Sequence, residues 1–334
     1  MGSYAFAPQV GGIETVGKLL AKQWTALGHE VIVATKTQAK IEAPLPYKIH
    51  RGPSRSEMVR LLQWADVYFQ SNVSLGLLSP WVSSRKPLFI THHTWVGHDR
   101  SRFHPAVLLK RLCTRFARNI AVSQAIADEL PHCDAILSGP YDSHVFGPGE
   151  SDARPKRDYL FVGRLVADKG VDVMIRALGE LRDSGQVFTA TIAGEGPARL
   201  EIEALIAKLS LADRVTLAGV VTGEALARCY RSHRILVVPS RWREPFGLVA
   251  LEGMACGADV IVSDAGGLPE AGGPTARVFR NGDVPELARL MKESARLIAE
   301  PTEKARHLGK YSIESVAARY LEIFQSALEI SPKR

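Results

Sequence analysis

Short apolar segments alternate with stretches of helical periodicity along the whole chain. A helix expected from about Glu14 places Val16, Leu20 and Trp24 on one face and ends at Gly28. Alternation of short strands with such helices is typical of parallel α/β sheets. The expected strands are residues 31–33, 67–69, 88–90, 120–122 and 136–137 in the first half, and 159–162, 191–193, 215–217, 235–238 and 260–262 in the second.

The two halves are separated by residues 138–155, which are rich in glycine, proline and polar side chains. This composition favours a domain boundary, and 334 residues are enough for two domains. We expect an N-terminal domain over 1–149, a second domain over 155–309, and a C-terminal segment, 310–334, whose helix packs back toward the first domain.

The composition is that of a globular protein, with 46% hydrophobic and 23% charged residues. No run of about 18 apolar residues occurs, which argues against a membrane-spanning helix, and no secretory signal pattern opens the sequence. The four cysteines form no C-x-x-C pair and show no framework spacing. We therefore expect reduced thiols and a cytoplasmic location.

The net charge of +7 is concentrated in residues 85–118, which contain eight basic residues and one acidic residue, Asp99. Such a patch suits an anionic partner. Leu108, Leu112 and Phe116 alternate there with basic positions, as expected of an amphipathic helix resting on the anionic inner face of the cytoplasmic membrane, and equally of a solvated helix face. Nucleic-acid binding is not expected, because aromatic residues are not interleaved as stacking platforms. The basic residues are Arg85, Lys86, Arg100, Arg102, Lys110, Arg111, Arg115 and Arg118.

The most specific motif follows the expected strand 235–238 and runs from Glu244 to Glu252 as E-P-F-G-L-V-A-L-E. Pro245 suits the first position of a helix, and the N–H groups of Gly247 and Leu248 would then form an anion site at its start. The two carboxylates lie one before the helix and one on its second turn, so they can bind two separate sets of hydroxyl groups. A capped core helix with a solvated glutamate at each end is the structural alternative.

Residues Gly163 to Gly170, G-R-L-V-A-D-K-G, form a loop after the expected strand 159–162. From such a short loop, Arg164 and Lys169 can converge on one pair of phosphates. A solvated turn is an equally good interpretation of this loop alone. Gly194-Glu195-Gly196-Pro197 and Asp264 to Glu270 are weaker turns of the same kind, at which backbone N–H groups can approach an anion.

In the first domain, Gly11 and Gly12 open a helix with two residues that lack a Cβ, so a phosphate or sugar can approach the backbone closely. His93 follows the expected strand 88–90, again at a carboxyl end. Four histidines lie within 13 residues, but their spacing matches no zinc pattern and no D-x-D occurs in the chain. We therefore expect no metal. The four histidines are His92, His93, His98 and His104.

Together, these motifs resemble the GT-B fold glycosyltransferases of family GT4. The resemblance rests on G-G-x-E at Gly11, His93, G-R-x4-K-G at Gly163, and G-E-G-P at Gly194. It continues in P-S-x3-E-P-F-G-L-x3-E from Pro239 to Glu252 and G-G-x-P-E at Gly266. It implies two doubly wound, Rossmann-like domains that face each other across a cleft. It also implies a retaining, metal-independent hexosyltransferase that moves a sugar from a nucleotide-diphosphate sugar to a glycan, glycolipid or small-molecule acceptor, as in polysaccharide biosynthesis.

The resemblance further implies a role for each motif. Arg164 and Lys169 would neutralise the diphosphate, where negative charge develops during transfer. Glu244 would hold the donor sugar and Glu252 the ribose. His93 would contact the donor sugar. The backbone contacts to the donor would come from Gly11, Gly12, Gly163, Gly194, Phe246, Gly247 and Leu248.

Two other functions remain open at this point. A nucleotide-sugar epimerase of the same fold would use the same donor, although the Glu244 to Glu252 segment looks like that of a transferase. Proteins of this family normally begin with a full strand before the glycine pair, whereas only ten residues precede Gly11, so the resemblance implies that the first strand is truncated here. A nucleotide-sugar-binding protein with weakened catalysis is therefore the other alternative.

Overall fold

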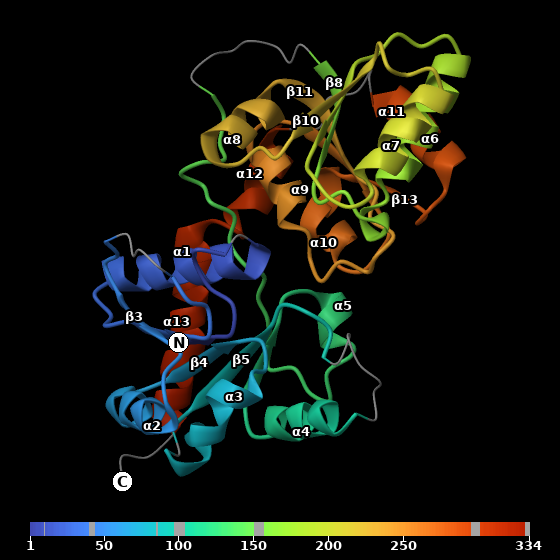
Figure 1. The fold of residues 1–334 in the computed structure, drawn as a ribbon. Coiled ribbons are helices and arrows are strands. Elements are labelled where there is room, and N and C mark those ends of the chain that lie inside the picture. Colours follow the sequence, from blue (N-terminus) through green and yellow to red (C-terminus); the bar gives the residue numbers. More distant parts are fainter. Residues whose placement is uncertain are drawn as a thin grey trace. The chain divides into compact units, whose positions relative to one another are not determined.

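The computed structural model describes residues 1–9, 11–39, 44–84, 86–96, 104–149, 157–294 and 301–330. The chain divides into two compact units (Figure 1). Unit 1 comprises Met1–Pro140 and Ser312–Arg334, and unit 2 comprises Tyr141–Tyr311. Each unit is an α/β domain with a parallel sheet, so the expected fold class is confirmed.

The boundaries between the units differ slightly from the expected ones. The division falls after Pro140, so residues 141–149, which we expected in the first domain, belong to unit 2. Residues 310–311 also belong to unit 2, and the rest of the C-terminal segment belongs to unit 1.

Unit 1 is built on a seven-stranded sheet of order β3-β2-β1-β4-β5-β6-β7. The short β1 lies inside the sheet, where Gly2 pairs in parallel with Ala34 and with Gln70. Glycine is required there, because a Cβ at Gly2 would lie 2.5 Å from the hydroxyl oxygen of Tyr68. The strands are β1 (Gly2–Ser3), β2 (Ile32–Thr35), β3 (Lys48–Arg51), β4 (Tyr68–Ser71), β5 (Leu88–His92), β6 (Arg118–Ala121) and β7 (Ala135–Ile136).

The helices of unit 1 include α13, which comes from the far end of the sequence. Trp24 of α1 donates a hydrogen bond from its indole nitrogen to the carbonyl of Ala317 in α13, at 3.2 Å. The Trp24 ring meets Phe69, Tyr320 and Phe324 at centroid distances of 5.5 to 5.9 Å in edge-to-face geometry. The helices are α1 (Gly12–Ala26), α2 (Arg55–Trp64), α3 (Leu75–Leu78), α4 (Pro105–Thr114), α5 (Gln124–Ala127) and α13 (Ile313–Ile330).

Unit 2 is built on a six-stranded parallel sheet of order β10-β9-β8-β11-β12-β13. Counted within the unit, this is the order 3-2-1-4-5-6 of a doubly wound nucleotide-binding fold, in which the direction of strand addition reverses between the first and fourth strands. Tyr159 of β8 accordingly pairs with Ala190 of β9 on one side and with Ile235 of β11 on the other. The strands are β8 (Arg157–Val162), β9 (Ala190–Ala193), β10 (Val215–Gly219), β11 (His233–Val238), β12 (Asp259–Ser263) and β13 (Arg277–Phe279).

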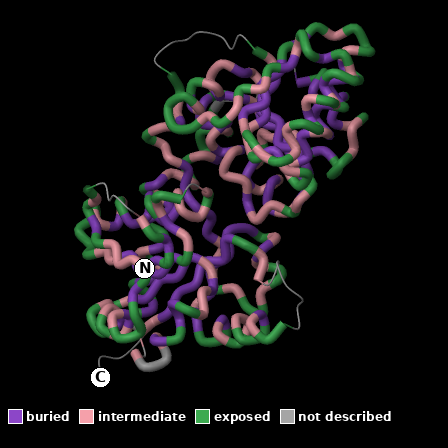
Figure 2. The backbone as a smooth tube through the Cα atoms, viewed as in Figure 1, coloured by how far each residue is buried: buried purple, intermediate pink, exposed green. Residues whose placement is uncertain are grey.

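Helices cover the sheet of unit 2 and bury most of its four central strands, β8, β9, β11 and β12, whereas the edge strands β10 and β13 are partly exposed; buried residues are purple in Figure 2. In α6, Val171, Met174, Ile175 and Leu178 form the buried stripe that the sequence periodicity indicates. Among the described residues, no helix in either unit combines the length and the apolar character needed to cross a bilayer. The helices of unit 2 are α6 (Val171–Asp183), α7 (Arg199–Lys208), α8 (Gly223–Arg231), α9 (Leu248–Ala255), α10 (Leu268–Gly272), α11 (Val284–Ser294) and α12 (Pro301–Gly309).

The aromatic cluster of unit 1 makes α13 part of its core. We expect Phe324→Ala to lower the free energy of unfolding by about 3 kcal/mol, because it removes a ring that is 8% exposed and leaves a cavity against Phe89. Leu328→Ala, at a position 41% exposed on the same helix, should change it by less than about 0.5 kcal/mol. Urea unfolding of both variants measures the change in the free energy of unfolding. A change in Phe324→Ala as small as that in Leu328→Ala would show that α13 is not part of the core.

Candidate functional site

Two loops of unit 2 meet at the point where strand order reverses. Residues 163–170 follow β8, and residues 239–247 follow β11, which pairs with β8. In open parallel sheets, ligands bind beyond the carboxyl ends of the strands at this position. Most of the site residues expected from the sequence lie on these two loops or on the helix that follows the second.

The two loops are in direct main-chain contact. The backbone N–H groups of Arg241 and Trp242 both donate to the carbonyl of Asp168, at 2.8 and 3.1 Å. Gly170 has a φ of +65°, and a Cβ there would lie 1.9 Å from the carbonyl oxygen of Pro239. Only glycine permits both this conformation and this approach.

The contact between the loops brings Lys169 to Glu244. The Lys169 ammonium lies 2.5 Å from Glu244 Oε1, and the Ser240 hydroxyl donates to the same oxygen at 2.7 Å. Both charged side chains are largely buried, at 27% and 13% exposed. The Glu244 carbonyl accepts a hydrogen bond from the Gly267 N–H, at 2.7 Å. The carboxylate is therefore fixed by a cation, a hydroxyl group and its own backbone.

Arg164 lies on the same loop as Lys169 and is exposed. Among the described residues it forms no ion pair, whereas the next residue, Leu165, is fully buried and bonds through its N–H to the carbonyl of Glu195. Gly163 and Gly194 bring the loops after β8 and β9 together, since a Cβ at Gly194 would lie 1.8 Å from the Gly163 carbonyl oxygen. The loop therefore has a fixed backbone and an available guanidinium group.

The start of α9 differs from the expected one. The helix begins at Leu248 with Gly247 as its N-cap, so the expectation that Pro245 is the first helical residue is wrong. Pro245 instead belongs to the loop, held in place by a parallel bridge between Glu244 and Gly266. Phe246 is buried, with its ring 5.3 Å from that of Tyr311. The N–H groups at the start of α9 remain a candidate anion site.

Glu252 lies on the second turn of α9, apart from Glu244. The Tyr230 hydroxyl donates to Glu252 Oε2 at 3.0 Å. Burial raises the pKa of Glu252 to about 7, and the nearby carboxyl group of Asp142 adds to this rise. The structure thus gives the two glutamates of the motif separate partners and separate environments.

Gly11, Gly12 and His93 lie in unit 1. Gly11 is the N-cap of α1 and Gly12 its first residue. His93 follows β5 and donates from its backbone N–H to the side-chain oxygen of Asn72, at 2.7 Å. Its ring is buried, and Nε2 has no hydrogen-bond partner among the described residues. Burial lowers the pKa of His93 to about 4, so the ring is neutral at pH 7.

Sequence reasoning missed several groups that hold this site. Ser240 is the serine of the P-S-x3-E pattern, so the motif itself could have indicated that it contacts Glu244. Tyr230 and the Asp172–Arg241 pair had no local signal, because their partners lie 22 and 69 positions away in the sequence. Within the described residues, no group of three or more histidine, cysteine or acidic side chains could hold a metal ion, while His98 lies outside them.

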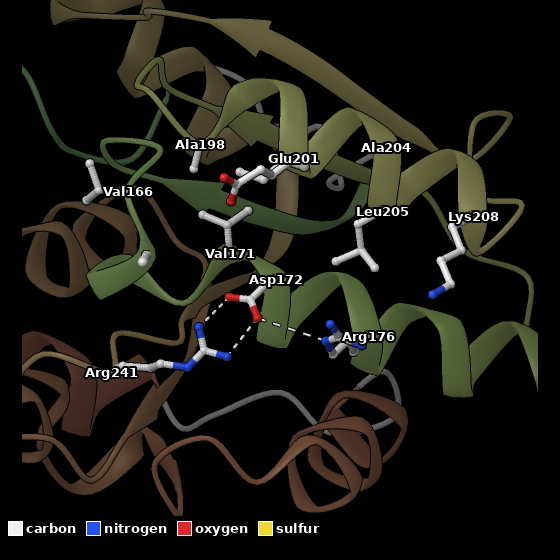
Figure 3. Close-up of a pocket in the computed structure, with 12 residues that line it drawn as sticks. Val166, Val171, Asp172, Arg176, Ala198, Glu201, Ala204, Leu205, Lys208 and Arg241 are labelled. Atoms are coloured by element: carbon white, nitrogen blue, oxygen red, sulfur yellow. Dashed lines mark hydrogen bonds and ion pairs between the residues drawn. The ribbon is translucent and has the colours of Figure 1, made fainter.

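A pocket of about 410 Å³ lies between α6 and α7 (Figure 3). The Arg241 guanidinium reaches the Asp172 carboxylate there through two hydrogen bonds of 2.5 and 2.7 Å, and Arg176 lies 3.9 Å from the same carboxylate. None of the expected site residues lines this pocket. The pocket matters for the site because it contains the Asp172–Arg241 ion pair, which joins the loop after β11 to α6, the helix that follows Lys169.

Comparison with known proteins agrees with this geometry. Residues 150–315 match the model of the family described as glycosyl transferases group 1, and residues 10–135 match that of glycosyltransferase family 4. The chain therefore belongs to the GT4-type glycosyltransferases of GT-B fold.

Two curated relatives illustrate the range of the family. The 2-deoxystreptamine glucosyltransferase of Streptomyces kanamyceticus is 31% identical over 196 residues, which cover 55% of this chain and 49% of that protein. The D-inositol 3-phosphate glycosyltransferase of Rhodococcus opacus is 34% identical over 232 residues, covering 60% and 52%. The chain thus spans about half the length of these relatives.

Solved structures are similar over nearly the whole chain. Anabaena HepE in complex with UDP has a TM-score of 0.82 at 19% identity and covers 97% of this chain and 98% of its own. A glycosyltransferase from Rickettsia africae has a TM-score of 0.79 at 16% identity and covers 99% and 98%. At these identities the similarity shows the fold.

The Asp172–Arg241 pair should matter for transfer more than for stability. Its side chains are 31% and 43% exposed, so Arg241→Gln should cost less than about 1 kcal/mol of stability. The loss of alignment between the loops that carry Lys169 and Glu244 should still reduce sugar transfer about tenfold, because small displacements of binding groups are costly.

The double variant Asp172→Arg/Arg241→Asp swaps the two charges of the pair and should restore part of the sugar transfer that Arg241→Gln loses. Arg289→Gln removes the comparable surface pair with Glu293 and should leave transfer unchanged. Unchanged turnover in Arg241→Gln would show that the loops do not need this ion pair.

Proposed function

We propose that this chain transfers a hexosyl group from a nucleotide-diphosphate sugar to an acceptor, with retention of anomeric configuration and without a metal ion. The observation that carries the proposal is the Lys169–Glu244 pair at the strand-order reversal of unit 2, on a loop whose Arg164 forms no ion pair with any described residue. A cation pair for a diphosphate and a fixed carboxylate for sugar hydroxyl groups are what such a donor needs.

In the proposed complex, Arg164 and Lys169 neutralise the diphosphate as it leaves. Glu244 accepts hydrogen bonds from the donor sugar, and Glu252 accepts them from the ribose. Phe246, Gly247 and Leu248 present backbone N–H groups at the start of α9. The close approach of Gly194 to the Gly163 carbonyl keeps the loop that carries Arg164 and Lys169 in a fixed backbone conformation.

Unit 1 is proposed to bind the acceptor. Gly11 and Gly12 form the start of α1, where the structure, as far as it describes the chain, shows no side-chain hydrogen bond at the N-cap. The neutral His93 ring has a free Nε2 and can exchange a hydrogen bond with a sugar hydroxyl without introducing a charge.

The relatives support a nucleotide-sugar donor. The similar HepE structures are complexes with UDP and with UDP-glucose, and several similar proteins are named as glycosyltransferases acting on small molecules. We propose a uridine-diphosphate hexose as donor and a glycan, glycolipid or small molecule as acceptor. No family match favours an epimerase or a weakened binding protein.

The proposed donor site predicts which variants lose activity. Lys169→Ala should reduce transfer more than tenfold, because it leaves both the diphosphate and Glu244 without their cation. Glu244→Ala should do the same through loss of the sugar contact. Thermal-shift screening with UDP, GDP and ADP identifies the base, since a ligand that binds the folded state raises its stability.

Controls distinguish this function from the alternatives. EDTA should leave transfer almost unchanged, and NMR of the product should show the anomeric configuration of the donor. A transferase at most hydrolyses its donor slowly when no acceptor is present, whereas conversion of the donor into an epimer would identify an epimerase. Near-normal turnover in either alanine variant would remove that residue from the site.

We also propose that the enzyme meets its acceptor at an anionic membrane surface through α4. Leu108, Leu109, Leu112 and Phe116 form one stripe on and just beyond this helix, with exposed fractions of 48 to 67%. Val107 and Thr114, which are buried, occupy the opposite face. A helix with one apolar face in the protein and another in solvent leaves the second face available for a partner.

The charges beside this stripe favour a lipid surface over other partners. Among the described residues, Lys110, Arg111 and Arg115 form no ion pairs. A second copy of the chain would bring these cations against their own copies, which is unfavourable in a symmetric interface. An anionic bilayer offers both an apolar interior for the leucines and phosphate groups for the cations.

Vesicle sedimentation tests the α4 surface. Vesicles containing phosphatidylglycerol should bind the protein, and vesicles of phosphatidylcholine alone should bind it weakly. Arg111→Gln with Arg115→Gln should weaken binding about thirtyfold, as expected for two cations at a lipid surface. Leu112→Glu should abolish it, whereas Leu328→Glu on α13, at a similarly exposed leucine, should not. Equal binding to vesicles with and without phosphatidylglycerol would contradict the proposal and show that the exposed face of α4 is only solvated.

A further inference from the structure

Tyr230 has a contact that the proposed chemistry does not yet use. It lies near the end of α8, its side chain is fully buried, and its hydroxyl donates to Glu252 Oε2 at 3.0 Å. Among the residues that the structure describes, Glu252 Oε1 has no hydrogen-bond partner. One oxygen of the carboxyl group is therefore fixed by protein, and the other is left for a ligand.

The ring of Tyr230 is held in place from several directions. Gly253, the neighbour of Glu252 on α9, allows the ring to lie close, since a Cβ there would be 3.4 Å from a ring carbon of Tyr230. The ring also meets Phe146 edge to face, with centroids 5.8 Å apart. Next to it, the Arg231 guanidinium donates to the Gly147 carbonyl at 3.2 Å. The phenol thus lies where α8, α9 and the segment 141–147 meet.

The surroundings of Glu252 and its hydrogen bond to Tyr230 act in opposite directions on the protonation of its carboxyl group. Asp142 from the segment 141–147 is the other titratable group that acts on it, and Glu252 in turn raises the pKa of Cys256, the residue that follows α9. Burial and Asp142 favour its protonated form, and the Tyr230 hydroxyl opposes them because it donates to the ionised form.

We propose that Tyr230 is a positioning residue for the nucleotide, holding the Glu252 carboxyl group turned so that Oε1 accepts hydrogen bonds from the ribose hydroxyls. The proposal rests on the proposed function, in which Glu252 binds the ribose. A carboxylate with one oxygen already bonded to a rigid phenol loses little rotational freedom when the ligand arrives. Tyr230 itself does not touch the ligand.

Tyr230→Phe tests this role because it removes the hydroxyl and keeps the ring. We expect UDP to bind about tenfold more weakly, as for loss of one hydrogen bond to a charged group, while the affinity for inorganic pyrophosphate stays unchanged. Donor KM should rise with little change in kcat. Isothermal calorimetry with UDP and with pyrophosphate gives both affinities.

The pH dependence gives a readout that a purely structural role would not move. Glu252 accepts hydrogen bonds from the ribose more strongly when it is ionised, so wild-type affinity for UDP should fall as the pH drops through about 7. Without the phenol the pKa of Glu252 rises further, so in Tyr230→Phe this fall should begin at a higher pH. Glu252→Gln should bind UDP weakly and show no such midpoint.

Tyr159→Phe is the matched control, since Tyr159 is also buried in unit 2 and its hydroxyl donates to the Met291 carbonyl at 3.1 Å. It should leave UDP affinity and its pH midpoint unchanged. Equal loss of UDP and pyrophosphate affinity in Tyr230→Phe, or an unshifted midpoint, would overturn the positioning role. Failure of the wild-type chain to bind any of UDP, GDP and ADP would instead contradict the proposed function.

Discussion

The main-chain contact between the loops after β8 and β11 is the constraint on which the site depends. Gly170 lies so close to the Pro239 carbonyl that no side chain fits between them, and the Asp168 carbonyl accepts two N–H groups from the other loop. These contacts fix the distance between two backbones, which in turn places Lys169 beside Glu244. The charged side chains are therefore positioned by hydrogen bonds and sterics before any ligand arrives, as preorganised electrostatic sites require.

Much of this arrangement could be predicted from the sequence because it follows from local patterns. Buried parallel strands are apolar segments that stand out between amphipathic helices, and their carboxyl ends locate the motif loops. The strands that were missed lack this signal. β3 has the sequence K-I-H-R at a sheet edge and β13 is three residues long, so neither presents an apolar run, whereas the two-residue β1 lies where a truncated first strand was expected.

The partners within the site could not be predicted in the same way. Lys169 and Glu244 were each expected to bind the donor, but a motif does not reveal that two such groups pair with each other when no ligand is present. The Pro245 prediction failed for a related reason. Proline suits a helix start in isolation, yet the bridge between Glu244 and Gly266 keeps this segment extended and delays the helix to Leu248. Tertiary contacts overrode a local preference there.

The Lys169–Glu244 pair has a consequence for how a site of this kind can remain folded while empty. A largely buried cation and a largely buried carboxylate would each be costly alone, because little water reaches them. Paired, the two charges offset each other without a ligand, and folding has already removed them from most of the water around them. In the proposed donor complex, the diphosphate and the sugar each take the place of one partner. The exposed Arg164 then adds the positive charge that the pair lacks, which favours an anion over a neutral ligand.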